Sequence, residues 1–314
     1  MKEIYLSISQ IATMIGVSQY GYITDIIYNL WYKVDPEGYT NKIKEMELKY
    51  NQSFTLLSEK DKLNLLTKDL GINLDDLENK TLDHNTLNLK QTKIINDINN
   101  IERNDFSEED LINKKNALSK IVTNMTNRKF GTHHEKTAIL AYAKATKTKI
   151  SNQQKTIIVQ IKKADAKYDA AWYIKGKIDG MSVSEIDGSI HIIEIKNRTK
   201  TLFKCLKDYE KPQIQIYMKL FDIPQSHLVE YLKKSDKQDE IHIIDVIFEE
   251  EYWTFIKKRL NLFISFFYKF LKNKKLQESM LLQNINYSCS MEDSEIEKLL
   301  RSELQTYFTE DNTL

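Results

Sequence analysis

Alternating apolar and polar positions dominate one stretch of this chain. In an extended conformation Ile178 lies on one side and Asp179 on the other. The run 189–196 is apolar and β-branched, and it follows Asp187-Gly188, a dipeptide typical of tight hairpin turns. The two segments are therefore predicted to pair as an antiparallel hairpin, with Ile178 and Ile195 pointing into the same layer.

The predicted turn also sets the register of the hairpin. With Asp187-Gly188 as a two-residue turn, Lys196 lies directly opposite Asp179, and Met181 lies opposite Glu194. Glu194 is then diagonal to Asp179, at roughly 7–8 Å. Glu194 and Lys196 share a face because side chains alternate along a strand. One face is therefore expected to gather two carboxylates and one ammonium group.

Hydrophobic spacing predicts elements along most of the remaining chain. Helices are expected at 7–14, 23–31, 128–147, 208–221 and 249–271, with mostly helical structure over 36–127 and a short helix around 292–308. Strands are expected at 155–163, 168–183, 228–232 and 241–248. This order of elements predicts an α/β fold, and the aromatic residues of 249–271 are expected in its core.

The hairpin carries residue types that suit phosphate chemistry. Asp179, Glu194 and the backbone carbonyl of Ile195 supply oxygen ligands of the kind that Mg²⁺ or Mn²⁺ prefers. A bound metal can polarise a phosphate and activate water, and Lys196 can orient that water or neutralise developing charge. The alternative is a surface hairpin with a cross-strand ion pair, which contributes little to stability.

Five motifs occur in an order that resembles a known family. They are Ser9-Gln-Ile-Ala-Thr-Met-Ile-Gly16-Val-Ser-Gln-Tyr20, Gly131-Thr-His-His-Glu135, Asp179-Gly180, Glu194-Ile195-Lys196 and Gln213-Ile-Gln-Ile-Tyr217. Together they resemble the PD-(D/E)xK nuclease superfamily, and within it the RecB, lambda-exonuclease and YqaJ viral-recombinase branch. The resemblance covers about 7–32 and 128–270 and leaves 36–127 unexplained.

The resemblance implies a fold and an activity. The fold would be a restriction-endonuclease-like α/β core, with a central mixed sheet flanked by helices and a helical insertion added. The activity would be Mg²⁺-dependent hydrolysis of DNA, as a 5′-to-3′ exonuclease on duplex ends in viral or phage recombination, repair or replication. The family also implies a toroidal homotrimer and a single-strand annealing protein as partner.

The resemblance assigns further roles residue by residue. Glu135 takes the position of an additional acidic metal ligand, and Gln213 and Tyr217 support the substrate or the lysine. Glu135 lies one helical turn after Gly131, where a glycine permits close approach of a backbone or phosphate. Arg128, Gly131 and Tyr20 are expected to contact DNA. For Tyr20 the alternative is a helical hairpin that packs on the core.

Basic residues supply the other candidates for DNA contact. The densest basic stretch includes Lys162 and Lys163, which could follow a duplex backbone, and Arg198 follows the site strand. A solvated surface is the alternative reading for these side chains. The net charge of the 314 residues is only +1, so a nucleic-acid surface must come from local clustering.

Composition limits the class of protein. Hydrophobic residues make up 41% of the chain, enough for a core, and no apolar run reaches the roughly 18 residues of a membrane span. The first ten residues lack a signal-peptide core, so we expect a cytoplasmic or nuclear location. Two cysteines, Cys205 and Cys289, argue against a disulfide scaffold and are too few for a four-cysteine iron–sulfur cluster.

Four regions are expected along the chain: a helical part of the nuclease core at 1–35, a mostly helical insertion at 36–127, the core with the active site at 128–275 and a helical tail at 276–314. The insertion could clamp substrate, bind a partner or be a solvated decoration. Two other functions remain open. One is a structure-specific or defence-type endonuclease on the same fold, and the other is a non-catalytic nucleic-acid-binding module. The presence of Asp179, Glu194 and Lys196 together argues against the second.

Overall fold

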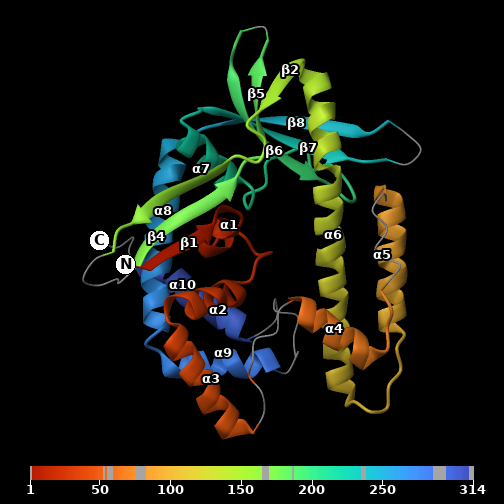
Figure 1. The fold of residues 1–314 in the computed structure, drawn as a ribbon, viewed down its shortest axis with the longest axis vertical. Coiled ribbons are helices and arrows are strands. Elements are labelled where there is room, and N and C mark those ends of the chain that lie inside the picture. Colours follow the sequence, from red (N-terminus) through yellow and green to blue (C-terminus); the bar gives the residue numbers. More distant parts are fainter. Residues whose placement is uncertain are drawn as a thin grey trace.

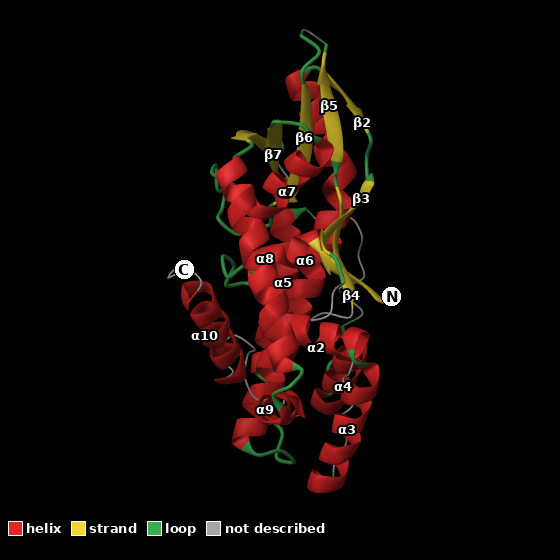
Figure 2. Ribbon diagram, turned by 90° about the vertical axis from the view of Figure 1, so that its left-hand side faces the viewer, coloured by secondary structure: helices red, strands yellow, loops and turns green. Residues whose placement is uncertain are grey.

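The computed structural model describes residues 2–51, 54, 59–74, 83–164, 170–185, 187–234, 238–285 and 295–310. Two mixed sheets and the helices around them form an α/β fold (Figure 1), so the predicted fold class is confirmed. The larger sheet lies at one end of the long axis, and helices α3, α4 and α9 lie toward the other end (Figure 2). No helix among the described residues is long and apolar enough to cross a membrane.

The larger sheet carries the predicted hairpin. Its strands are β2 (Thr148–Ser151), β5 (Gly180–Ser184), β6 (Ile190–Asn197), β7 (Gln225–Leu232) and β8 (Glu240–Ile247), in the order β2-β5-β6-β7-β8. Strands β6 and β7 are parallel, and the other neighbours are antiparallel. Helix α7 (Lys211–Phe221) belongs to the crossover that joins the parallel pair, as parallel pairing requires. The helix expected at 208–221 is therefore present, three residues shorter.

Both faces of this sheet are covered. Ile193 and Ile195 pack in a cluster with Ala138 and Tyr142 of α6 (Glu108–Thr146). Ile192 alternates to the other face and joins the main core, to which α7 and α8 (Glu250–Phe270) contribute. Because β6 is buried on both faces, the charged residues at its carboxyl end are held against a rigid support.

The register of the hairpin differs from the prediction by two residues. Met181 pairs with Ile192 rather than Glu194, and Gly180 pairs with Ile193. The cause is a longer turn: Ser184 N–H donates to the Ser189 carbonyl at 2.9 Å, so the turn spans more than the two residues Asp187 and Gly188. A shift by two leaves the paired side chains of β5 and β6 on their expected faces. Lys196 is therefore not directly opposite Asp179.

The strand expected at 168–183 is broken at the site. It divides into β4 (Ala170–Lys177) and β5, with Ile178 and Asp179 at the bend between them; residue 168 lies outside the described residues. Ile178 packs in the main core and Ile195 in the α6 cluster, so the prediction that both face one layer is wrong. The bend turns the chain from one sheet into the other.

A smaller sheet contains the first residues of the chain. Its order is β1-β4-β3, with β1 (Lys2–Ser7) parallel to β4 and β3 (Thr156–Lys162) antiparallel to it. Strand β1 was not predicted, and the helix expected at 7–14 is reduced to a 3-10 turn, η1 (Ile8–Gln10), and the short α1 (Ile11–Met14). Region 1–35 thus contributes a strand as well as helices, including α2 (Ile23–Val34).

One continuous helix crosses the expected boundary between insertion and core. Helix α6 has 39 residues, so residues 127 and 128 lie in its interior. Its first half packs with α4 (Glu59–Leu70) and α5 (His84–Asn99) in a separate hydrophobic cluster (Figure 1). Helix α3 (Pro36–Tyr50) instead contributes Met46 to the main core. The separate part of the insertion therefore begins after Phe54, which is also in the main core, and the continuous helix α6 connects it to the site.

The carboxyl-terminal helices complete the main core. Trp253, Phe263 and Phe267 of α8 are buried in it, as predicted from their spacing. Helices α9 (Lys274–Ile285) and α10 (Glu295–Glu310) also pack there, α10 by burying residues such as Phe308. Cys205 is exposed and has no disulfide partner among the described residues, whereas Cys289 lies outside them.

Candidate active site

Asp179, Glu194 and Lys196 lie together at the carboxyl end of β6. The Lys196 ammonium donates to Glu194 Oε1 at 2.8 Å, and the Ile195 N–H donates to Asp179 Oδ2 at 2.7 Å. Glu194 is only 3% exposed. Asp179 lies at the bend after β4. Glu194 and Lys196 lie on one face of β6, because side chains alternate along a strand. Two carboxylates and one ammonium therefore converge, although by a different register from the predicted one.

The two carboxylates are electrostatically strained. Burial and the negative charge of Glu194 raise the pKa of Asp179 to about 8. Burial also raises the pKa of Glu194, although the positive charge of Lys196 opposes that rise. Nearby Glu135 contributes to both shifts. Because a nearby cation favours the ionised form of a carboxylate, a positive charge added here would relieve the strain.

The residues present fit a divalent cation. Glu194 Oε2 is buried and has no hydrogen-bond partner among the described residues, although a carboxylate oxygen without a partner is costly. Asp179 adds a second hard oxygen ligand of the kind that Mg²⁺ prefers. Within the described parts of the chain, no three His, Cys, Asp or Glu side chains lie close enough together to hold a metal ion by themselves.

Helix α7 adds Gln213 and Tyr217 to the site. Gln213 Oε1 accepts from Lys196 Nζ at 3.3 Å, and the Tyr217 hydroxyl donates to the Lys177 carbonyl at 2.6 Å. Lys177 ends β4, two residues before Asp179. Gln213 thus contacts the lysine, and Tyr217 holds the backbone that leads to the aspartate. Since the two residues are one helical turn apart, they face the site together.

Gly176 makes this contact of Tyr217 possible. A Cβ atom at this position would lie 2.8 Å from the Tyr217 hydroxyl oxygen and 2.8 Å from Cδ1 of Ile8. Real Cβ atoms do not approach other atoms so closely, so a larger residue would displace one of the two neighbours. Gly176 is therefore required by the packing of Ile8 and Tyr217 against β4.

The second half of α6 brings Glu135 and Gly131 toward the site. Glu135 Oε1 accepts from Gln154 Nε2 at 2.7 Å. The negative charge of Glu135 contributes to the raised pKa of both Asp179 and Glu194. The Gly131 carbonyl accepts from Asn197 Nδ2 at 2.7 Å, which links the helix to the last residue of β6. A Cβ atom at Gly131 would have no neighbour within 4 Å. Packing inside the described chain therefore does not require this glycine.

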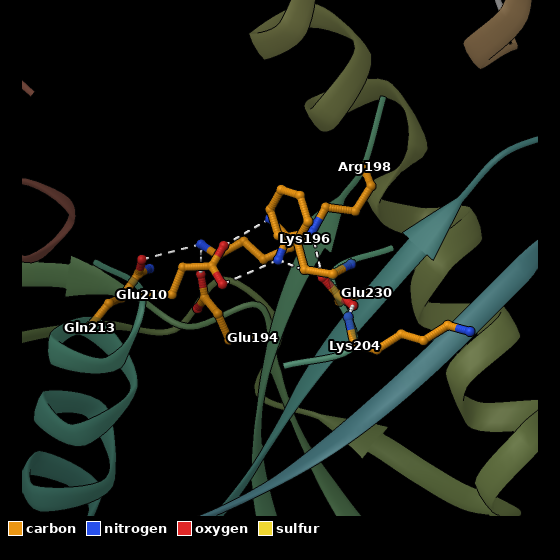
Figure 3. A network of polar contacts seen from close by, with 8 residues as sticks. Glu194, Lys196, Arg198, Lys204, Glu210, Gln213 and Glu230 are labelled. Carbon is orange, nitrogen blue, oxygen red and sulfur yellow. Dashed lines mark hydrogen bonds and ion pairs between the residues drawn. The ribbon is translucent and has the colours of Figure 1, made fainter. Parts of the chain in front are cut away.

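Arg198, a candidate for DNA contact in the sequence, is paired with two glutamates in the structure. Its guanidinium donates to Glu230 at 2.7 Å and to both carboxylate oxygens of Glu210, at 2.8 and 3.1 Å. Only 11% of the side chain is exposed. Figure 3 shows this network beside the one formed by Lys196. The charge of Arg198 is therefore paired with two carboxylates inside the protein, and a contact of Arg198 with DNA stays a prediction.

Glu210 and Glu230 are components of the site region that the sequence analysis missed. Glu230 is fully buried and also accepts from the backbone N–H groups of Phe203 and Lys204, at 3.1 and 2.7 Å. A signal existed: Glu230 is a single charged residue inside an apolar strand, and a buried charge requires a partner. Glu210 gave no comparable signal, because it stands among charged residues before α7.

The remaining predicted DNA contacts lie on different parts of the fold. Tyr20 is 62% exposed, and its ring packs edge-on against Tyr209 at 4.9 Å. Arg128 is exposed on α6 just under one turn before Gly131. Lys162 ends β3 in the smaller sheet, and Lys163 follows it exposed. The two lysines therefore lie at the end of a strand that belongs to a different sheet from Glu194.

Comparisons with known proteins find similarity only at the level of structure. No model of a known protein family matches the chain, and no curated protein matches its sequence. An alkaline exonuclease, LHK-Exo from Laribacter hongkongensis, aligns with 69% of this chain and 98% of its own, at 12% identity and a TM-score of 0.36. LHK-Exo in complex with dAMP aligns with 66% of this chain and 90% of its own, at 13% identity and a TM-score of 0.34. A protein called SSO0001 aligns with 75% of this chain and 97% of its own, at 15% identity and a TM-score of 0.33. At these TM-scores the similarity assigns no activity to this chain.

Proposed function

We propose that this protein is a divalent-metal-dependent DNA nuclease of the PD-(D/E)xK type. The observation that carries the proposal is the buried Glu194: one carboxylate oxygen binds Lys196, and the other has no hydrogen-bond partner among the described residues. Asp179 lies close enough for the charge of Glu194 to raise its pKa. A pair of strained carboxylates beside a lysine is suited to a hard cation and a phosphate.

Each residue has a role in this proposal. Asp179 and Glu194 would hold Mg²⁺ or Mn²⁺, with the Ile195 carbonyl as a further oxygen ligand. Glu135 is a further ligand by the family resemblance, although it forms no three-carboxylate site with them among the described residues. The cation would polarise the phosphate and lower the pKa of a bound water. Lys196, held by Glu194 and Gln213, would position the attacking water or neutralise negative charge in the transition state.

The favoured substrate is a duplex DNA end, degraded from 5′ to 3′. Both follow from the resemblance of the five motifs to the lambda-exonuclease branch. By that resemblance, the protein would act as a ring-shaped trimer and pass single strands to an annealing protein during viral or phage recombination. Circular duplex has no end, so the substrate class can be tested directly. We expect purified protein with Mg²⁺ to release nucleotides from end-labelled linear DNA and to leave closed circular DNA intact.

Two other outcomes of the digestion would change the assignment. Circles cut as readily as linear DNA would replace the exonuclease with an endonuclease on the same fold. DNA that is bound but never cleaved, with either Mg²⁺ or Mn²⁺, would indicate a non-catalytic binding module. Asp179→Asn serves as the inactive control, which excludes a contaminating nuclease.

Gly131 allows a prediction in which stability and activity change in opposite directions. Alanine is favoured over glycine in a helix interior by about 1 kcal/mol, and the new Cβ atom would contact nothing within 4 Å. Gly131→Ala is therefore expected to stabilise the protein. If a DNA backbone approaches here, the methyl group displaces it and lowers cleavage by about 10- to 100-fold.

The two quantities are measured by urea unfolding and by single-turnover cleavage. Asn124→Ala, at an exposed position earlier on α6, is the control for helix propensity and should raise stability without changing cleavage. A Gly131→Ala variant that is more stable and equally active would mean that no substrate approaches the helix at this position.

A further inference from the structure

The loop between β6 and α7, residues 198–210, holds an exposed aromatic ring beside the site. Phe203 is 40% exposed. The loop begins two residues after Lys196 and leads into the helix that carries Gln213. A single exposed apolar side chain is common on protein surfaces. Phe203 differs in that a buried carboxylate holds its backbone.

A buried carboxylate fixes the backbone on which Phe203 stands. Glu230 is 0% exposed, and it accepts from the N–H groups of Phe203 and Lys204. Lys204 has φ 57, the left-handed region that residues other than glycine rarely adopt. Such a conformation persists only where surrounding contacts enforce it, and it is concentrated at functional sites. The exposed ring is therefore carried by a rigid backbone.

A second anchor comes from the insertion. Asn88 of α5 donates its side-chain N–H to the Thr199 carbonyl at 2.7 Å. At the same end of the loop, Arg198 N–H donates to the Tyr231 carbonyl at 2.8 Å. The loop is thus held from β7 and from α5. An ordered loop loses little conformational entropy when it binds a ligand.

Basic side chains surround the ring. The Lys207 ammonium and the Arg198 guanidinium lie 4.7 and 4.3 Å from the centroid of the Phe203 ring, and Lys200 and Lys204 are exposed on the same loop. Of the two acidic residues in the loop, Glu210 is already paired with Arg198, and Asp208 is exposed. The loop therefore offers an apolar ring within a positively charged surface.

We propose that Phe203 is a stacking platform for an unpaired base of single-stranded DNA, with Lys200, Lys204 and Lys207 contacting the adjacent phosphates. Aromatic rings with basic neighbours are the usual components of single-strand binding. Bases inside a duplex are stacked on both faces, whereas an unpaired base has a face free to stack on this ring. Lys207 is a flexible side chain, which can turn to a phosphate when a base takes its place. The proposal rests on the proposed nuclease function, because the loop that carries the ring connects the strand of Lys196 to the helix of Gln213.

The test measures binding without cleavage. A single-stranded oligonucleotide containing 2-aminopurine is titrated in EDTA, where fluorescence quenching reports stacking and anisotropy reports affinity. Phe203→Ala is expected to weaken binding by about 5- to 150-fold and to remove most of the quenching. Phe203→Leu should behave similarly, because it keeps an apolar side chain but has no ring, whereas Phe203→Trp should retain both signals.

Three controls make the result specific. Tyr32→Ala removes another exposed aromatic side chain, on α2, and should leave binding unchanged. Polyphosphate carries charge without bases, so its affinity should not depend on Phe203. Melting temperatures verify folding, and the backbone N–H groups that bind Glu230 remain in every Phe203 variant.

Equal affinity and quenching for wild type, Phe203→Ala and Phe203→Leu would overturn the platform. A loss of polyphosphate affinity in Phe203→Ala equal to the loss of DNA affinity would also overturn it. Phe203 would then affect binding only through the positions of the neighbouring basic side chains, without stacking on a base. Neither result affects the nuclease assignment, which depends on digestion by wild type and Asp179→Asn. Conversely, binding that depends on Phe203 in a protein without cleavage would support the platform and refute the nuclease.

Discussion

Replacing Asp179 with asparagine is expected to lower DNA cleavage by at least about 1,000-fold, which corresponds to about 4 kcal/mol of transition-state stabilisation. Asparagine keeps an oxygen that can accept from the Ile195 N–H group, as Asp179 does at 2.7 Å. The backbone geometry should therefore survive. What is lost is a negative charge that a divalent cation needs as a ligand.

The same substitution has an expected effect on stability that does not depend on cleavage. In wild type, Mg²⁺ or Mn²⁺ should raise the melting temperature, because an ion that binds only the folded state stabilises it. Asp179→Asn should abolish that rise. Without metal, the variant should be at least as stable as wild type, since burial and the charge of Glu194 already disfavour the ionised Asp179.

The matched control is Asp187→Asn, on the turn of the same hairpin. Asp187 is exposed, and hydrogen bonds from Ser184 and Ser189 lower its pKa to about 2. Its loss should change neither cleavage nor the melting shift produced by metal. Cleavage by Asp179→Asn close to that of wild type would remove Asp179 from the reaction and with it the proposed metal site.

The largest expected loss of stability comes from Glu230→Ala. Glu230 accepts hydrogen bonds from Arg198 and from the N–H groups of Phe203 and Lys204. Removing one partner of a buried charge network typically costs roughly 3–5 kcal/mol, because the remaining groups stay buried without a counter-charge. Total stabilities are about 5–15 kcal/mol, so this loss is a large fraction of the whole.

Urea unfolding followed by circular dichroism measures this loss. The control is Glu250→Ala, whose partner Lys219 lies at 2.9 Å and whose own side chain is 62% exposed. An exposed pair of this kind should contribute no more than about 1 kcal/mol. If Glu230→Ala costs as little as the control, the buried network does not hold the loop that carries Phe203.

Local sequence patterns were sufficient to bring the main site residues together. The alternation around Glu194 and Lys196 places both on one face of β6, and an error of two residues in register leaves that face unchanged. The spacing of Gln213 and Tyr217 similarly places them on one face of α7. These features depend on the periods of strands and helices, which neighbouring residues determine.

Other features depend on contacts between distant segments. Strand β1 shows only a short alternation of Ile4 and Leu6, and it is a strand because β4, more than 160 residues later, pairs with it. Short segments of this kind have no strong preference of their own, so the partner decides their conformation. The same holds for Arg198, which reads as a surface charge until Glu210 and Glu230 are seen beside it.

The sequence by itself therefore determined the strand that carries Glu194 and Lys196, the helix that carries Gln213 and Tyr217, the faces that these residues occupy and the chemistry that they offer. Only the tertiary structure decided the break of the strand at Ile178 and Asp179, the register of β5 against β6, the continuity of α6 through residue 128 and the burial of Arg198. The physical reason is the range of the interactions. Periodicity arises from the backbone within a few residues, whereas register and burial are set by hydrogen bonds and packing with segments that are close only after folding.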